Sequence, residues 1–366
     1  MKNGAPSKLE MIQNELCQGI LNKVWRVGDK LPTESELALK FGCSVGTINK
    51  AVSLLVHHGL IERKPRTGTR VISDNMDATG IKLDAFAFIY PSDQHEGIWR
   101  AMKGFQAAAQ EKKRRLCLLS SGTDYQKELA LVGQLAEFDV LGAALYPLLP
   151  SFGDLVHYLR ILKDSRFPVV LVGAELPGQE ISSVAIDGFH AGYTMTRHLL
   201  DLGLRKIGFF ASRSWSVSVR DRYQGYKWAR SEAALPLEDN LVFLNPSMHV
   251  DFEDPLREPI EMSRAYLDQA SGMGLQGVVC YSDFFARGLI QVAAERGLKV
   301  PQDLKVTGID HHALSKPDEV PLTTYRVPYE EMGRIAFELL EARVADASSP
   351  VLEKYVRGQI VVKEST

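Results

Sequence analysis

Cysteine is scarce in this chain of 366 residues, and its four cysteines stand far apart. No two of them form a CxxC pair, which argues against a zinc site or a disulfide framework. Long apolar runs are also missing, because no stretch reaches the ~18 residues that indicate a membrane-spanning helix. The opening residues, MKNGAPSKLEMIQNEL, lack the apolar core of a secretory signal. We therefore expect reduced cysteines, no membrane partner and a cytoplasmic protein.

The usual signatures of catalysis are absent as well. The sequence has no GxSxG, no HExxH, no P-loop and no GxGxxG after a predicted strand. His311 and His312 are adjacent, but neighbouring side chains diverge, so we do not expect them to bind a metal. The sequence predicts neither an enzyme nor a bound cofactor.

What the chain does have is an uneven distribution of charge. Residues 1–75 hold 11 Lys and Arg against 7 Asp and Glu, a net of +4, whereas the remainder carries −6. A small basic segment joined to a larger acidic one favours a polyanion as the partner of the first. We therefore predict a basic domain at 1–75, a polar linker at 76–82 and a large domain at 83–366.

The basic segment contains the start and stop signals of three short helices. Apolar residues at helical spacing predict a first helix over 9–21. Thr33, with Glu36 three residues later, forms a capping-box pattern that opens a second helix ending at Gly42. Ser44 is the expected N-cap of a third helix, which stops at Gly59. These elements predict a helix-turn-helix, and LIERKPRTGTRVI then predicts a two-stranded hairpin, or wing.

The segment KLPTESELALKFGCSVGTINKAVSLLVHHGLIERKPRTGTRVI resembles the GntR-type winged helix. The resemblance implies that the third helix enters the major groove of double-stranded DNA and that the wing tip approaches the minor groove. It further implies a homodimer on a palindromic operator. The expected DNA contacts are Thr33, Ser44, Thr47, Asn49, Lys50, Lys64, Arg66, Thr67 and Gly68.

This segment departs from its family at four positions. Ser35, Val45 and Asn49 stand where the family usually has Arg, and Arg66 stands where the wing usually has Gly. Arg is the commonest reader of guanine, whereas Asn suits adenine. We therefore predict an operator different from the family norm and richer in A·T.

The remaining basic groups are expected to contact phosphates, which position a protein on DNA without specifying sequence. An alternative is that they form only a solvated basic face on a degenerate winged helix that mediates protein contacts. The groups are Lys30, Lys40, Lys50, Arg63, Lys64, Arg66 and Arg70.

Beyond the linker, apolar strands alternate with helical stretches, which predicts a doubly wound, parallel α/β architecture. Ligands in such folds bind beyond the carboxyl ends of the strands. Short carboxylates and an arginine fork in one cleft suit a polyhydroxylated ligand, and aromatic rings suit the apolar face of a sugar. The candidates are Asp187, Arg222, Ser282, Asp283 and Asp310, with the rings of Trp99, Trp215, Tyr281 and Phe284.

The segments IDGFHAGYTMTRHLLDLGLRKIGFF and RDRYQGY, with YSDFFARGLIQVAAERGLKVPQDLKVTGID, resemble the LacI/GalR-type effector domain, which is similar to periplasmic sugar-binding proteins. The LacI-type DNA headpiece is absent. The resemblance implies two subdomains joined by three crossovers, with the effector between them. We expect these subdomains at 83–190 plus 324–346 and at 191–320 plus 350–366.

By the same resemblance, Arg222, Asp283 and Asp310 match effector-binding residues. Asp187 matches more loosely, and Ser282 stands where the family often has Asn. Four of the candidates could instead serve the fold. Asp187 and Asp283 are expected N-caps as well, and Trp99 and Trp215 suit the core as much as a pocket.

Together these features predict a ligand-responsive DNA-binding transcriptional regulator, more a repressor than an activator, of sugar-utilisation genes. The expected effector is a monosaccharide, with a nucleobase left open. The alternative is a cytoplasmic sugar- or purine-binding protein whose winged helix serves protein contacts. A sugar-processing enzyme would need a nucleophile or an acid–base pair in the cleft, and the sequence shows none.

Overall fold

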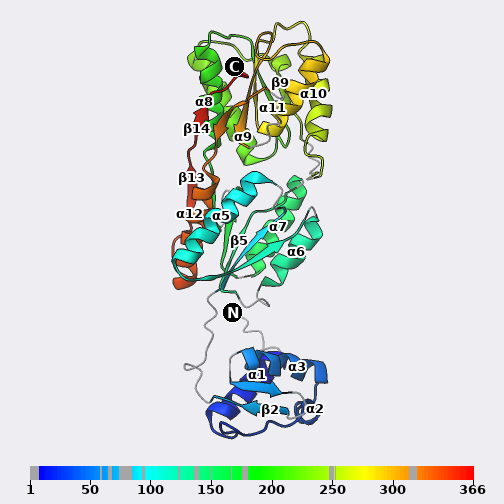
Figure 1. Ribbon diagram of the computed structural model, residues 1–366, viewed down its shortest axis with the longest axis vertical. Coiled ribbons are helices and arrows are strands. Elements are labelled where there is room, and N and C mark those ends of the chain that lie inside the picture. The colour runs from blue at the N-terminus through cyan, green and yellow to red at the C-terminus, as the bar shows by residue number, and fades with distance from the viewer. Residues whose placement is uncertain are drawn as a thin grey trace. The chain divides into compact units, whose positions relative to one another are not determined.

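The computed structural model describes residues 8–57, 60–64, 68–73, 85–92, 95–122, 124–135, 140–149, 151–165, 167–174, 180–246, 251, 253–312 and 320–366. The chain divides into unit 1, Met1–Asp84, and unit 2, Ala85–Thr366 (Figure 1). The predicted linker, 76–82, lies outside the described residues, as do Arg66 and Thr67 at the predicted wing tip. Of the described helices, none is long and apolar enough to cross a membrane.

Unit 1 contains the predicted helix-turn-helix and wing. Its elements are α1 (Lys8–Leu21), α2 (Glu34–Phe41), α3 (Val45–His57), β1 (Ile61–Lys64) and β2 (Gly68–Val71). The two strands pair antiparallel, with Ile61 opposite Val71. Apolar side chains from all three helices and both strands form one core, which includes Leu16, Leu37 and Ile48.

The helix ends of unit 1 follow from local chemistry. Thr33 Oγ1 accepts a hydrogen bond from the Glu36 backbone N–H at 3.3 Å, and Glu36 Oε2 accepts one from the Thr33 N–H at 2.7 Å, which confirms the capping box. Gly42 ends α2 with a left-handed φ of 56°, a conformation that glycine adopts without steric cost. Ser44 Oγ accepts from the Thr47 N–H at 3.1 Å, as expected of an N-cap. Helix α3 ends at His57, and the predicted stop at Gly59 lies outside the described residues.

Unit 2 contains two six-stranded sheets, and the first is parallel throughout. Phe86 and Phe88 face one side of it, whereas Ala87 and Ile89 face the other, so both faces are buried. The strands, in spatial order, are β13 (Glu353–Val356), β7 (Ser182–Ile186), β6 (Val169–Val172), β5 (Ala143–Leu145), β3 (Ala85–Tyr90) and β4 (Arg115–Ser120). One face is covered by α5 (Glu96–Glu111) and α12 (Tyr329–Ala345), the other by α6 (Tyr125–Gly133) and α7 (Phe152–Ser165). We call this layer lobe 1.

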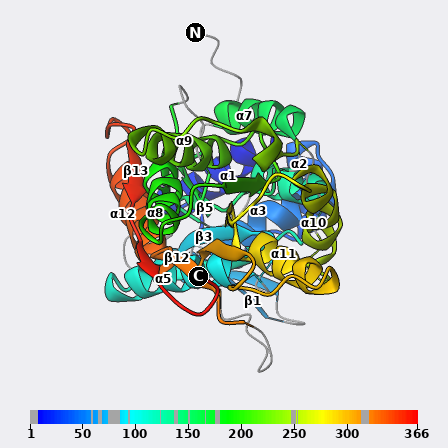
Figure 2. The ribbon, with the colours of Figure 1, turned by 90° about the horizontal axis from the view of Figure 1, so that it is seen from above.

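The second sheet is parallel except at one edge, where β12 and β14 pair antiparallel. Its strands, in spatial order, are β14 (Gln359–Val361), β12 (Thr323–Arg326), β11 (Lys305–Asp310), β10 (Gly277–Cys280), β8 (Ile207–Ala211) and β9 (Val242–Leu244). Helices α8 (Gly188–Asp201) and α9 (Val217–Glu232) pack together, as do α10 (Arg257–Gln269) and α11 (Asp283–Glu295). Figures 1 and 2 show α8 on one side of this sheet and α10 on the other. We call this layer lobe 2, and the two lobes together give the predicted doubly wound α/β fold.

The chain crosses between the lobes three times, but two of the expected subdomain boundaries are wrong. Strand β12 (Thr323–Arg326), expected largely in the first subdomain, pairs with β11 in lobe 2. Strand β13 (Glu353–Val356), expected in the second, pairs with β7 in lobe 1. Strand β13 is an edge strand and β12 lies between β11 and β14, and their short sequences, EKYV and TTYR, carry no signal for which sheet they join. The crossovers therefore follow β7, β12 and β13.

Paired glycines bring helices of each lobe into backbone contact. A Cβ on Gly104 of α5 would overlap the carbonyl oxygen of Glu330 in α12. In lobe 2, a Cβ on Gly192 of α8 would overlap the carbonyl oxygen of Arg222 in α9. These glycines let the helix axes approach more closely than any other residue would allow. The first turn of α12 and the middle of α9 are thereby held against their lobes.

We predict that Gly192→Ala destabilises unit 2, because the added methyl group must push α9 away from α8. Such overpacking costs about 1–3 kcal/mol of unfolding free energy. Gly133→Ala at the end of α6 is the matched control, since a Cβ there meets nothing within 4 Å. Urea unfolding of both variants measures the effect, and equal midpoints for Gly192→Ala and Gly133→Ala would contradict it.

Candidate functional site

A cavity of about 250 Å³ lies between the two lobes of unit 2. Its volume is just below the ~300–1,000 Å³ typical of ligand pockets, which suits a small ligand. Lobe 1 contributes His95, Tyr146 and Tyr329 to its polar lining, and lobe 2 contributes Arg213, Arg222 and Asp310. The lobe 2 side of the cavity includes the carboxyl ends of β10 and β11, where ligands bind in parallel sheets.

Arg222 and Asp310 form a buried ion pair in this cavity. Arg222 is 7% exposed, donates through Nη1 to the Tyr281 carbonyl and approaches Asp310 Oδ1 to 4.0 Å through Nη2. The Tyr329 hydroxyl donates to the same Oδ1 at 2.7 Å. Burial raises the pKa of Asp310, and Arg222 and the Tyr329 hydrogen bond oppose the rise. Because both contacts use Oδ1, Oδ2 is the oxygen that a ligand hydroxyl would meet.

The backbone at Asp310 is held in an uncommon conformation. Its φ is 124°, and that of His311 is 60°. Side chains with a Cβ rarely adopt these values, and such positions cluster at ligand sites, where the surrounding structure over-determines them. The strain turns the chain at the end of β11, directly at the cavity wall.

Asp283 does not line the cavity, contrary to the sequence prediction. It is 1% exposed; Oδ1 accepts from Thr324 Oγ1 at 2.5 Å and Oδ2 from the His312 backbone N–H at 2.8 Å. Burial, reinforced by the charge of Asp310, raises the pKa of Asp283 to about 7. Both oxygens are occupied within the protein. Asp283 therefore fixes the turn that follows Asp310.

Asp187 also lies outside the cavity lining. Its Oδ1 accepts from the His190 N–H at 2.8 Å as the N-cap of α8, and its Oδ2 accepts from Arg357 Nε at 2.8 Å. Asp187 stands at the first crossover and Arg357 at the third, so their ion pair joins two of the connections between the lobes. The N-cap interpretation of Asp187 is therefore confirmed.

Two of the predicted aromatic residues, Trp99 and Trp215, lie outside the cavity lining, whereas Ser282 belongs to it. Trp99 is 41% exposed, with Lys103 Nζ 4.5 Å from the centre of its ring. Trp215 is half-buried and does not line the cavity. Ser282 caps α11 by accepting from the Phe285 N–H at 3.4 Å, and it does line the cavity, together with Phe284.

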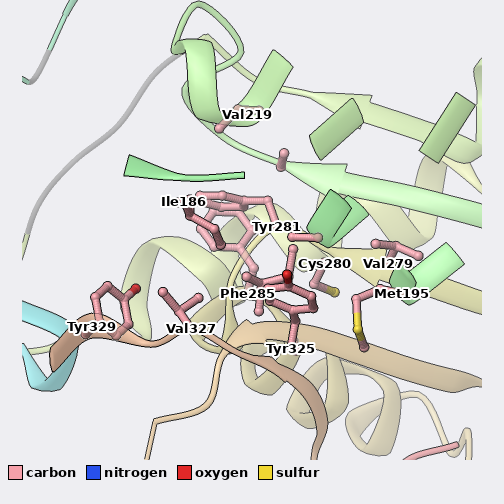
Figure 3. Close-up of a cluster of buried hydrophobic side chains, with 14 of the residues drawn as sticks. Ile186, Met195, Val219, Val279, Cys280, Tyr281, Phe285, Tyr325, Val327 and Tyr329 are labelled. Atoms are coloured by element: carbon pink, nitrogen blue, oxygen red, sulfur yellow. The ribbon is translucent and has the colours of Figure 1, made fainter. Parts of the chain in front are cut away.

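Aromatic rings from both lobes surround the polar groups. Phe284 lies 5.8 Å from His95 and 5.2 Å from His312, measured between ring centres. Figure 3 shows Tyr281 and Phe285 within a buried apolar cluster to which both lobes contribute, and Tyr329 at one end of the part drawn. Tyr281 and Phe285 pack edge to face at 4.7 Å. Rings so placed can cover the apolar face of a small cyclic ligand.

Most lining residues escaped the sequence reasoning, among them His95, Tyr146, Arg213 and Tyr329. Arg213 follows β8 directly, so the rule about strand ends could have found it. Burial lowers the pKa of His95 to about 3; His312 and Arg213 act the same way and Asp310 opposes them. Nothing in the sequence marks Tyr329, because it reaches the cavity only after β12 has joined lobe 2 and the chain has crossed back.

In unit 1, the predicted DNA-contacting residues divide into exposed groups and groups already bonded. Lys50 on α3 is exposed, and no hydrogen bond or ion pair joins it to any part of the chain that the structure describes. Asn49 Oδ1 accepts from Arg63 Nη1 at 3.0 Å, and Arg63 Nη2 pairs with Glu34 at 2.6 Å. Arg63 therefore ties the wing to α2 and α3, a role that its charge alone did not suggest.

The remaining predicted contacts of unit 1 lie at helix ends and in the wing. Thr33 and Ser44 are N-caps, and Thr47 Oγ1 lies 2.9 Å from Ser44 Oγ. Lys64 Nζ pairs with Glu62 at 2.9 Å. Gly68 opens β2 with a φ of 88°, a value that favours glycine at the turn of the wing.

Comparison with known proteins matches two families. Residues 8–71 match the family described as "Bacterial regulatory proteins, gntR family", and residues 196–366 match the family described as "Periplasmic binding protein-like domain". The arabinose metabolism transcriptional repressor of Geobacillus stearothermophilus is 26% identical over 371 residues, covering 100% of this chain and 99% of the relative. Its counterpart from Halalkalibacterium halodurans is 27% identical over 386 residues, covering 98% and 96%.

Solved structures share the fold. The transcription regulator CcpA of Lactococcus lactis aligns with a TM-score of 0.68 at 24% identity, covering 78% of this chain and 100% of that one. A transcriptional regulator CelR–cellobiose complex aligns with a TM-score of 0.67 at 22% identity, covering 92% and 100%. The relatives are regulators and not enzymes. The chain thus joins a gntR-family winged helix at 8–71 to a periplasmic binding protein-like domain at 196–366, and over its whole length it is similar to arabinose metabolism transcriptional repressors.

Proposed function

We propose that the protein represses carbohydrate-utilisation genes by binding a palindromic operator as a homodimer, and that a small sugar in the cavity of unit 2 changes its operator affinity. The observation that carries the proposal is the Arg222–Asp310 pair at a cavity between two lobes, in a chain that also has a winged helix. The protein would act in the cytoplasm, on the bacterial chromosome, without a cofactor.

The chemistry of the cavity favours a polyhydroxylated ligand. A carboxylate such as Asp310 accepts hydroxyl hydrogen bonds, and guanidinium and phenol groups donate to ring and hydroxyl oxygens. The aromatic side chains of Phe284 and Tyr281 offer apolar surface beside these groups. The names of the relatives point the same way, since two concern arabinose metabolism and one solved neighbour is a complex with cellobiose. The small volume favours a monosaccharide.

The crossovers provide a route from ligand to lobe movement. The Tyr325 hydroxyl lies 2.7 Å from His190 Nδ1 and accepts from the Gly358 N–H at 2.7 Å, so β12, α8 and the third crossover are joined. A ligand that contacts both lobes would favour one angle between them. For allostery, it must bind the operator-competent and operator-incompetent states unequally, typically by about 1–3 kcal/mol.

The exposed face of α3 would read the operator. Lys50 is suited to a phosphate, and Asn49, in place of the family's Arg, is suited to adenine. Arg63 occupies one acceptor site of Asn49 Oδ1, which leaves the Nδ2 amide group to donate to a base and the second lone pair of Oδ1 to accept from it. This arrangement supports an operator richer in A·T than is usual in the family.

Arg222→Gln should abolish the sugar response while leaving operator affinity within about twofold. The change removes the donor fork, and a small sugar should then bind at least about tenfold more weakly, which is 1.4 kcal/mol. Thermal shift and calorimetry with monosaccharides, and fluorescence anisotropy with a selected operator, measure both properties. Arg264→Gln removes an exposed Arg of the same lobe and serves as the control. Unchanged sugar binding in Arg222→Gln would remove this cavity as the effector site.

Sugar and operator should weaken each other by the same factor, about 5–150-fold, because linkage is reciprocal. Sugar affinity measured by calorimetry with and without saturating operator tests this. A sugar that binds equally in both cases would show that the cavity does not control DNA binding.

Lys50→Ala should weaken operator binding and lower the slope of log K against log salt concentration by about one unit, as expected for one lost phosphate contact. Lys23→Gln, an exposed change in the same unit, should leave the slope intact. Asn49→Arg should instead alter the selected sequence towards guanine. If the protein binds no DNA in a random-sequence selection, the winged helix serves protein contacts and the repressor function is wrong.

A further inference from the structure

Arg213 is an unpaired cation at the wall of the cavity. It follows β8 directly, lines the cavity and is half-buried. Its Nε is inaccessible to solvent and has no hydrogen-bond partner, and within the described ranges no hydrogen bond or ion pair reaches any atom of its guanidinium. Two buried arginines of unit 2 have carboxylate partners: Arg100 pairs with Glu330 at 2.8 Å and Arg230 with Glu238 at 3.6 Å.

The backbone holds Arg213 in place. Its φ is 51°, in the left-handed region that side chains with a Cβ seldom adopt, and its carbonyl accepts from the Ser216 N–H at 2.8 Å. Such strain persists only where the surrounding structure imposes it, and it concentrates at ligand sites. The fold thus incurs two costs at this position, a strained backbone and a partly desolvated guanidinium without a partner.

Within the described chain, the charged groups around Arg213 leave it without an ion pair of its own. Asp310 is the carboxylate on which both arginines act: Arg222 pairs with it, Tyr329 donates to it, and Arg213 helps to oppose the rise of its pKa. His95 is neutral at pH 7, because burial lowers its pKa to about 3 with help from His312, against Asp310. Tyr146 is neutral as well, because burial raises its pKa to about 12, supported by Asp310 and opposed by Arg213 and Arg222.

Three further carboxylates line the cavity, Asp251, Asp254 and Glu258, and in the described chain none of them forms an ion pair with Arg213. Asp251 Oδ2 pairs with Arg257 at 3.7 Å, and its Oδ1 accepts from the Glu253 and Asp254 N–H groups. Asp254 itself is exposed to solvent. No ion pair joins any carboxylate of the described chain to Arg213, which leaves its guanidinium available to an anionic ligand.

We propose that Arg213 binds an anionic group of the effector, the carboxylate of a sugar acid or the phosphate of a sugar phosphate. The planar guanidinium matches either group with two parallel hydrogen bonds. Asp310 and Arg222 would meanwhile hold the ligand's hydroxyls. The inference rests on the proposed function, in that the cavity is taken as the effector site, and it narrows the effector to a monosaccharide derivative with one acidic group.

Matched ligand sets test this inference on the full-length protein. One set is galactose, galacturonate and galactose 6-phosphate; the other is arabinose, arabinonate and arabinose 5-phosphate. Calorimetry should show that at least one anionic member binds ten or more times more tightly than its neutral parent, with the advantage shrinking as salt rises. A phosphate, whose second pKa is about 6, should gain affinity between pH 5 and 7. A carboxylate, ionised throughout that range, should not.

Variants of Arg213 assign the preference to this side chain. Arg213→Gln should lose at least tenfold in affinity for the anion and change the affinity for the neutral parent by less than about twofold. Arg213→Lys keeps the positive charge but lacks the planar pair of N–H donors, and it should retain part of the preference for anionic over neutral ligands. Arg264→Gln should match the parent protein, and melting curves check that each variant is folded.

The possible failures can be told apart. If neutral sugars bind as tightly as their acids and phosphates and still release the operator, the anionic effector is wrong and the proposed repressor function stands. An anion preference that survives in both Arg213 variants would overturn the role of Arg213. If no compound of either set binds or alters operator affinity, the cavity is not a sugar site, and the inference falls together with the proposed sugar response.

Discussion

The buried pair between Arg222 and Asp310 is the contact on which the site depends. Desolvating two charges is costly, and their attraction repays that cost only where further hydrogen bonds satisfy them. The Tyr281 carbonyl does so for Arg222, and the Tyr329 hydroxyl does so for Asp310. Because Tyr329 belongs to lobe 1 and the pair to lobe 2, the same network that stabilises the charges also joins the two lobes at the cavity.

Elements remote from the cavity hold this network in place. Gly192 lets α8 meet the backbone of Arg222, and Gly104 lets α5 meet the first turn of α12, which carries Tyr329. Asp283 uses both of its oxygens to fasten β12 and the turn after Asp310. A ligand that displaced Tyr329 from Asp310 would therefore act on the contact between the lobes as well as on a single side chain.

In unit 1, some of the predicted DNA-contacting residues are hydrogen-bonded within the winged helix, whereas others are exposed and available to an external partner. Thr33, Ser44 and Arg63 are engaged in caps and in a bridge from wing to helices, so their polar groups stabilise the winged helix itself. Lys50 makes no such contact with the described chain and is exposed, which leaves it for an external anion. The polar residues of the sequence motif thus divide into scaffold and contact surface.

The sequence by itself determined what is local: the capping box at Thr33, the left-handed end at Gly42, the alternation of buried strands with helices, and the strand-end position of Asp310. These follow from periodicity and from the chemistry of neighbouring residues. Only the tertiary structure decided that Asp283 and Asp187 bond inward while Arg213 and Tyr329 reach the cavity. That choice depends on which strands pair at the sheet edges and on where the chain crosses between lobes. These are contacts between residues far apart in the sequence, and no local pattern encodes them.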